Sequence, residues 1–175
     1  MKDLSFDHKS AVVWSLPITL VLLAAVLLPH AIFYRENAFA ELFRDLGWWL
    51  APLFIVSVVI HELLHAVTVI ALGRLRWEDV SYGFNWQAMM PFAHPRRAVK
   101  AEVYRATVAA PGVVLGILPA ASGLVSGSGS WSAYGAIMLA AAAGDAMILW
   151  SLRRTPRSAL VQDHPSRVGC EVVSA

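Results

Sequence analysis

Cysteine is almost absent from this chain: its 175 residues include only Cys170. A single thiol excludes an internal disulfide, and it excludes the zinc sites that are built on two to four cysteines. Any metal ion must therefore be bound by histidine and carboxylate side chains. That ligand set is more typical of catalytic sites than of structural ones.

Charged residues are also scarce. They make up 15% of the sequence, whereas hydrophobic residues make up 58% and the mean hydropathy is +0.59. A soluble domain has about a quarter charged residues, so this balance indicates an integral membrane protein. The net charge is only +2 and no basic stripe with interleaved aromatic residues is present, so we expect no nucleic-acid partner. The length suits one domain, and we expect residues 1–175 to form a single membrane domain.

Four apolar stretches are long enough to cross a bilayer, because about 20 helical residues span its hydrocarbon core. We expect membrane spans at 11–33, 47–72, 106–125 and 131–152. The first is longer than the apolar region of a signal peptide, and no small-residue cleavage pattern follows it. Pro111 and Pro119 should kink or break the third helix. The predicted fold class is an all-α membrane protein with four transmembrane helices.

One long polar segment, residues 73–105, connects the second and third spans. From Val80 to Trp86 its apolar side chains alternate with polar or small ones, a period of two that is typical of a half-buried strand. We expect a small β-hairpin there, and an irregular amphipathic loop is the alternative. Residues 34–46 have apolar side chains at helical spacing, which predicts a short helix at the membrane interface. Residues 153–175 are interpreted as a polar, basic tail.

Lysine and arginine are distributed unevenly between the two sides of the predicted membrane. Twelve of the fourteen precede the first span, lie in the segment 73–105 or follow the fourth span, and only Arg35 and Arg44 fall on the opposite side. The positive-inside rule then places both termini and the segment 73–105 in the cytoplasm. We therefore expect a multi-pass membrane protein with cytoplasmic N- and C-termini.

The second span contains His61-Glu62-Leu63-Leu64-His65, an H-E-x-x-H pattern in an almost wholly apolar helix. Residues four apart lie on one helix face, so both imidazoles can bind one metal ion while Glu62 reaches a water molecule on it. Ionisable side chains in membrane helices are rare and usually functional. The alternative is a helix whose histidines are satisfied by hydrogen bonds within the protein.

Asp145 is the other ionisable side chain deep within a span. His65 lies nine residues before Arg74, and Asp145 lies eight residues before Arg153, which correspond to about 13 Å and about 12 Å along a helix. Spans two and four run in the same direction, so the two groups come to the same level. We predict one zinc ion, a fourth position open to water, and three protein ligands: His61, His65 and Asp145. Glu62 would act as the general base toward that water.

Other ligand sets fit the sequence less well. The extended pattern of soluble zinc peptidases needs Gly and His where this chain has Thr68 and Ala71, so that class is excluded. Glu78 or Glu102 could in principle be the third ligand, but both lie in the charged segment 73–105 and are expected to be solvated. His164, in the tail, is expected at the surface. A bis-histidine haem is disfavoured, because two histidines four apart on one helix cannot take opposite axial positions.

Four segments that occur in order carry a family resemblance: His61–His65, Ala110–Pro119, Ala143-Gly144-Asp145, and Asp163-His164-Pro165 with Gly169. Together they resemble the putative zincin peptidase family of small integral-membrane proteins, over about residues 50–173. That family is similar in its logic to the site-2 proteases, which are intramembrane zinc enzymes. The resemblance implies metal ligands at His61, His65 and Asp145 and a catalytic glutamate at Glu62.

The expected function is that of a membrane-embedded zinc metallopeptidase. It would hydrolyse a peptide bond of a protein or peptide substrate, membrane-associated or not, through a metal-activated water with a glutamate general base. The alternative is a non-catalytic membrane protein that uses the same His/Asp cluster to bind a metal or to relay protons or ions.

Overall fold

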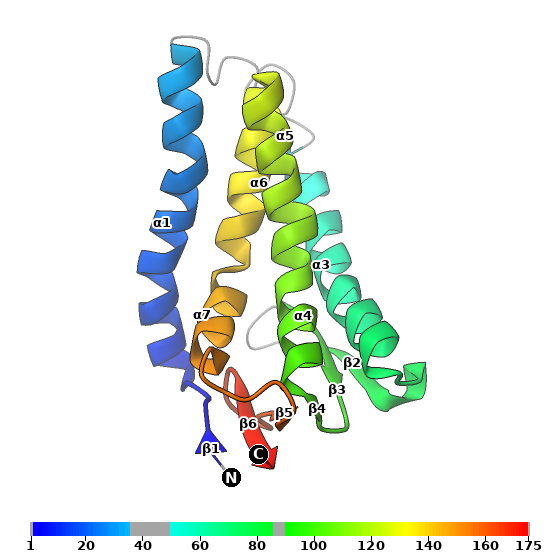
Figure 1. Ribbon diagram of the computed structural model, residues 1–175. Coiled ribbons are helices and arrows are strands. Elements are labelled where there is room, and N and C mark those ends of the chain that lie inside the picture. Colours follow the sequence, from blue (N-terminus) through cyan, green and yellow to red (C-terminus); the bar gives the residue numbers. More distant parts are fainter. Residues whose placement is uncertain (1, 36–49, 86–89, 175) are drawn as a thin grey trace.

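The computed structural model describes residues 2–35, 50–85 and 90–174 (Figure 1). This part of the chain is mostly helical, with small sheets. Its helices are α1 (His8–Tyr34), α3 (Leu50–Gly73), the short 3-10 helix η2 (Trp77–Asp79), α4 (Ala101–Pro111), the π-helix η3 (Gly112–Ile117), α5 (Leu118–Ser126), α6 (Gly129–Ala141) and α7 (Ala143–Leu152). Its strands are β1 (Lys2–Asp3), β2 (Val80–Asn85), β3 (Met90–Pro95), β4 (Val99–Lys100), β5 (Leu160–Asp163) and β6 (Cys170–Ser174).

Three of the described helices are long and apolar enough to cross a membrane. They are Lys9–Tyr34, Pro52–Gly73 and Ala101–Ser126, with hydropathies of 2.5, 2.2 and 1.9. A fourth candidate span consists of α6 and α7 together. Many large apolar side chains on α1 and α3 are exposed, including Trp14, Phe33 and Ile55, which is expected of helices that face lipid rather than water. The interfacial helix predicted at 34–46 lies almost wholly outside the described residues, as does the beginning of the predicted second span.

The third span is continuous across its two prolines. Pro111 ends α4, Pro119 lies in the first turn of α5, and the six residues between these helices form η3. Proline lacks an N–H and clashes with the carbonyl four residues earlier, so a regular α-helix is costly at these positions. In a π-helix the hydrogen bonds join residues five apart instead of four, so the residues between the two prolines do not need the regular α-helical bonds. The kink or break predicted at the two prolines is thus a π-helical stretch within a continuous helix. The candidate span also starts at Ala101, five residues earlier than the predicted 106.

The fourth candidate span is divided, although its sequence contains no proline. Helix α6 ends at Ala141, α7 begins at Ala143, and the two are bent by 53°. The break falls within a run of small residues, Ala140–Gly144, whose side chains provide little packing to keep a helix straight. Our prediction of one unbroken helix over 131–152 missed this break, which places Asp145 in the first turn of α7.

Helices α1 and α3 lie on opposite sides of a central group formed by α4, α5 and α6 (Figure 1). Helix α1 packs against α6 and α7, and α3 packs against α4 and β3. Helices α5 and α6 approach each other so closely that a Cβ at Gly135 would stand 2.3 Å from the backbone nitrogen of Ala120. A hydrogen bond of 2.8 Å between the hydroxyls of Ser57 and Tyr134 connects α3 to α6.

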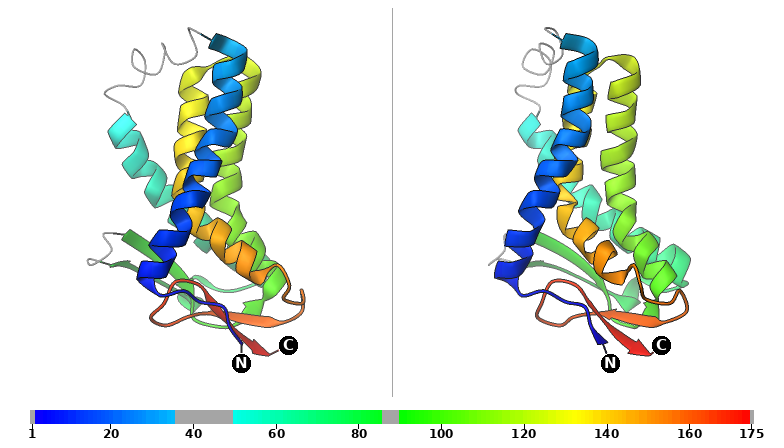
Figure 2. Two further views of the ribbon diagram at one scale, coloured as in Figure 1. Left: turned by 90° about the vertical axis from the view of Figure 1, so that its left-hand side faces the viewer. Right: turned by 60° about the vertical axis from the view of Figure 1, so that its left-hand side comes forward.

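Two small sheets lie at one end of the molecule, beside both chain termini (Figure 2). Strands β2 and β3, which lie between α3 and α4 in the sequence, form an antiparallel pair in which Val80 is opposite Pro95. Residues 86 and 87, the end of the stretch in which apolar and polar side chains alternate, lie outside the described residues. The other sheet has the strand order β1-β6-β5-β4, so the N-terminal strand pairs with the C-terminal one. Residues 153–174, which we interpreted as a polar tail, therefore contain two strands of a sheet, and their side chains Val161, Cys170 and Val172 are buried.

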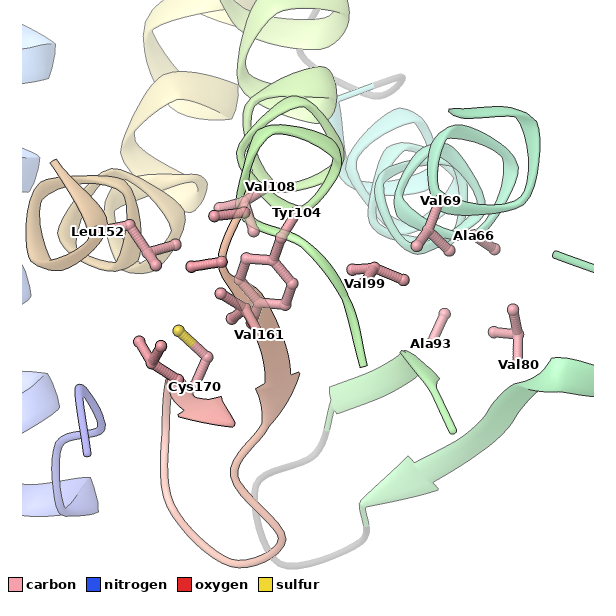
Figure 3. Close-up of a cluster of buried hydrophobic side chains, with 13 residues drawn as sticks. Ala66, Val69, Val80, Ala93, Val99, Tyr104, Val108, Leu152, Val161 and Cys170 are labelled. Carbon is pink, nitrogen blue, oxygen red and sulfur yellow. The ribbon is translucent and has the colours of Figure 1, made fainter. Parts of the chain in front are cut away.

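The main core lies where α3, α4 and α7 meet these strands (Figure 3). Tyr104 and Val108 of α4 occupy its centre, with Val69 of α3, Leu152 of α7 and Val161 of β5 around them. Burial of each such side chain contributes about 1.5–3 kcal/mol. The helices that carry the predicted site residues are therefore held together at their sheet-facing ends.

Candidate metal centre

The two histidines of α3 lie one helical turn apart, as their spacing requires. Their rings are 4.9 Å apart, centre to centre, in an edge-to-face arrangement, and both side chains are half-buried. Glu62 follows His61 directly and is also half-buried. Apolar residues make up most of the rest of α3, so these three ionisable groups stand in otherwise apolar surroundings.

Asp145 of α7 reaches both histidines. Its Oδ2 is 3.1 Å from His61 Nε2, and its Oδ1 is 3.6 Å from His65 Nε2. Zinc binds nitrogen and oxygen ligands at about 2.0–2.2 Å, so neighbouring ligand atoms of a tetrahedral site are about 3.3 Å apart. One potential ligand atom from each of the three residues lies within 4.8 Å of the others. The structure thus brings together the three residues that were predicted as metal ligands.

The Asp145 carboxylate is poorly satisfied by the protein. Among the described residues, its buried Oδ2 has no hydrogen-bond partner, although the His61 ring nitrogen is only 3.1 Å away. The contact is close but does not have hydrogen-bond geometry. A buried carboxylate oxygen without a donor is costly, and a cation between the carboxylate and the two imidazoles would remove that cost. The donor set and its geometry therefore fit a zinc ion.

A main-chain carbonyl of α4 orients the His65 ring through the nitrogen that does not face Asp145. Its Nδ1 lies 2.9 Å from the carbonyl oxygen of Thr107. A carbonyl can only accept, so Nδ1 carries the proton and donates it, and Nε2 presents its lone pair toward Asp145. Histidines that bind metals are commonly fixed in this way through their second nitrogen. The Thr107 hydroxyl is itself buried and has no partner in the described part of the chain.

A second cluster of ligand-type side chains, formed by Asp3, His164 and Glu171, lies in the four-stranded sheet. His164 Nδ1 accepts hydrogen bonds from the backbone N–H groups of Ser166 (3.2 Å) and Arg167 (3.0 Å). Its Nε2 therefore carries the proton and faces Glu171 Oε1 at 3.3 Å. That nitrogen has no free lone pair for a metal ion.

The Asp3 carboxylate in this second cluster is also satisfied. Its Oδ1 accepts hydrogen bonds from the backbone N–H and the hydroxyl of Ser5, and its Oδ2 pairs with Arg167 Nη1 at 2.9 Å. The hydrogen bonds from Ser5 lower the pKa of Asp3, and the charge of Arg167 adds to this effect. The second cluster is thus a hydrogen-bonded structural network, and His164 lies within it rather than free at the surface.

The other carboxylates considered from the sequence are not part of the metal centre. Glu78 is exposed and pairs with Arg76 at 3.1 Å, and Glu102 is exposed in the first turn of α4. Neither belongs to a group of possible metal ligands in the described residues. Thr107 was missed by sequence reasoning, because a backbone carbonyl leaves no signature in the sequence.

The model of a family described as putative zincin peptidase matches residues 54–160. This range contains both histidines of α3, Glu62, Thr107 and Asp145, and it ends at the first residue of β5. No curated protein and no solved structure matches the chain.

Proposed function

Since this chain belongs to the putative zincin peptidase family, we propose that it is a membrane-embedded zinc metallopeptidase that hydrolyses a peptide bond. The observation that carries the proposal is the meeting of the H-E-x-x-H histidines with Asp145, whose buried Oδ2 has no hydrogen-bond partner among the described residues. A buried carboxylate oxygen without a donor is costly, and a metal ion held by the same three residues would remove that cost.

In this proposal His61, His65 and Asp145 hold one zinc ion through Nε2, Nε2 and the carboxylate. When bound, the zinc ion supplies Lewis-acid activation of a water molecule and of the substrate carbonyl. Thr107 keeps the His65 lone pair directed at the site through its carbonyl oxygen. The ligand side chains are 13–18% exposed, so water can reach them while lipid and protein exclude bulk solvent.

Glu62 is the proposed general base. Its carboxylate takes a proton from the attacking water, whose oxygen forms a bond to the carbonyl carbon of the substrate. The same carboxylate then gives the proton to the departing amine nitrogen as the C–N bond breaks. Glu62 is suited to this role because it adjoins His61 on α3 without being one of the three converging ligands.

We further infer the four-span topology, with α6 and α7 together as the fourth span. Both termini, the β2–β3 pair and the four-stranded sheet then lie on the cytoplasmic side. The described N- and C-terminal strands pair with each other, which supports placing both on one side, and the distribution of lysine and arginine favours the cytoplasm.

The proposed substrate is a protein or peptide that approaches along the membrane surface. The two-stranded sheet packs against α3 through β3, and in the described residues β2 pairs with β3 alone. An extended substrate can add to such an edge by main-chain hydrogen bonds. Strand addition would bring an extended peptide to the sheet that packs against the helix with the H-E-x-x-H motif.

The test compares the wild-type protein with Glu62→Gln after purification and reconstitution in lipid vesicles. We expect one zinc ion per chain in both. Vesicles that also contain a mixture of membrane proteins should yield new peptide N-termini with the wild type, and about 10²–10⁴-fold more slowly with Glu62→Gln. A wild-type protein without stoichiometric zinc, or equal cleavage by Glu62→Gln, would contradict the proposal.

A further inference from the structure

Helix α4 contacts both helices that supply the metal ligands. The Thr107 carbonyl accepts the hydrogen bond from His65 of α3. Two residues earlier, Arg105 Nη2 donates to the main-chain carbonyls of Leu152, the last residue of α7, and of Thr155, three residues beyond it. Helix α7 carries Asp145, so the position of α4 determines how the histidines and the aspartate stand relative to each other.

Helix α4 is in turn attached to the C-terminal strands through Tyr104. This side chain is 4% exposed and lies in the main core beside Val161 and Cys170 (Figure 3). Its hydroxyl donates to Asp163 Oδ1 at 2.5 Å. A buried hydroxyl that lost its partner would cost about 1–3 kcal/mol. Tyr104 thus fixes α4 relative to β5 one turn before Thr107, at a distance of about 4.5 Å along the helix.

The acceptor, Asp163, is held by a closed turn. It is the last residue of β5 and stands opposite Cys170 of β6. In the turn that follows, the backbone N–H of His164 donates to the carbonyl of Gly169 at 3.0 Å, and the His164 ring accepts two further backbone N–H groups. The strand pairing and these hydrogen bonds therefore hold Asp163 in a defined position relative to β6.

The family match ends at residue 160, before this turn, and assigns no role to it. One hydrogen bond and one helical turn nevertheless separate Asp163 from the carbonyl that orients His65. We propose that Tyr104 and Asp163 are positioning residues of the metal centre, which set α4 so that Thr107 directs His65 and Arg105 holds α7. This inference rests on the proposed function, since it requires the centre to bind zinc.

The experiment measures zinc affinity of the full-length protein in detergent, by competition with a chromophoric chelator. Tyr104→Phe keeps the ring in the core and removes only the hydroxyl. We expect it to weaken zinc binding about tenfold, at the low end of the range for residues behind metal ligands. Asp163→Leu should have a similar effect. Asp163→Asn should restore affinity to near the wild-type value, because its amide oxygen still accepts from the Tyr104 hydroxyl.

Arg167→Gln is the matched control. It removes the ion pair with Asp3 and loosens the same sheet at β1, away from α4. The melting temperature of every variant is recorded, and we expect Arg167→Gln to lower it while leaving zinc affinity unchanged. Wild-type affinity in Tyr104→Phe, or an equal loss in Arg167→Gln, would overturn the positioning role while leaving the proposed function intact. A wild-type protein that binds no zinc would overturn both.

Discussion

The two clusters of histidine and carboxylate side chains in this protein use similar groups in opposite ways. In the first cluster, His61, His65 and Asp145, a ring lone pair and a buried carboxylate oxygen converge, and among the described residues that oxygen has no hydrogen-bond partner. In the second, Asp3, His164 and Glu171, backbone N–H groups, a hydroxyl and a guanidinium satisfy the ring and the Asp3 carboxylate. Proximity of ligand-type residues is common to both. Lone pairs that the protein itself leaves unsatisfied are what distinguish a candidate metal site from a structural network.

The largest expected difference concerns zinc itself. Asp145→Ala should weaken zinc binding by more than about a hundredfold, the upper range for residues that only support a ligand. Glu171→Ala should leave one zinc ion per chain with unchanged affinity, because in the second cluster His164 Nε2 carries a proton and the Asp3 carboxylate is already satisfied. Metal analysis and chelator competition on both variants measure this. Two zinc ions per wild-type chain, one of them lost in Glu171→Ala, would invalidate the distinction between the clusters.

The next largest effect tests the second cluster as a structural network. His164→Ala removes the acceptor for two backbone N–H groups, each loss costing on the order of 1 kcal/mol. The β5–β6 turn should then open about tenfold more often or more, since 1.4 kcal/mol is a factor of ten. Cys170 is fully buried in β6, so its rate of reaction with a maleimide at pH 7 reports the opening. Arg154→Gln, at an exposed site outside the sheet, serves as the control and should react at the wild-type rate.

A smaller effect on stability is expected at Thr107, whose buried hydroxyl has no hydrogen-bond partner among the described residues and is not a predicted metal ligand. Thr107→Val has nearly the same shape and removes the buried Oγ1 that lacks a partner. We expect thermal unfolding to show a gain of about 1 kcal/mol, with zinc affinity unchanged because His65 bonds to the backbone carbonyl. A loss of stability would show that the hydroxyl has a partner, such as a water molecule.

The last prediction concerns pH and the sheet that contains the second cluster. Burial, assisted by the Asp163 carboxylate, raises the pKa of Cys170 from 9.0 to about 12. The thiol is thus neutral in the closed sheet, and below pH 9 it adds no pH dependence. Between pH 9 and 12 the opened segment ionises first, so closure weakens as pH rises. Hydrogen exchange of β6 at pH 8 and pH 10 should show this weakening in the wild type and less of it in Cys170→Ala.

The sequence predicted which ionisable side chains lie together better than it predicted the path of the backbone. The spacing of His61 and His65 and the matched depths of His65 and Asp145 follow from helical geometry alone, and the structure brings these side chains together. Their roles as zinc ligands, and that of Glu62 as base, stay predictions. The bend between α6 and α7 was not predicted, because a run of alanine and glycine is compatible with a straight or a broken helix.

The folding of residues 160–174 into strands β5 and β6 could not be predicted from the sequence either. Strands β5 and β6 have only four and five residues, too few for alternation to stand out from chance. Their pairing with β1 joins the two ends of the chain, and no local pattern reports such a contact. Tyr104 could be recognised as apolar and helical, but its bond to Asp163 depends on that distant pairing.

The 53° bend between α6 and α7 also has an electrostatic consequence. A carboxylate in the middle of a straight membrane helix would gain nothing from the peptide dipoles around it. Because α7 starts anew at Ala143, Asp145 stands in its first turn, where the partial positive charge of a helix N-terminus stabilises an anion by about 0.3–1 kcal/mol or more. The break between α6 and α7 thus places a partial positive charge of the main chain beside this carboxylate, in otherwise apolar surroundings.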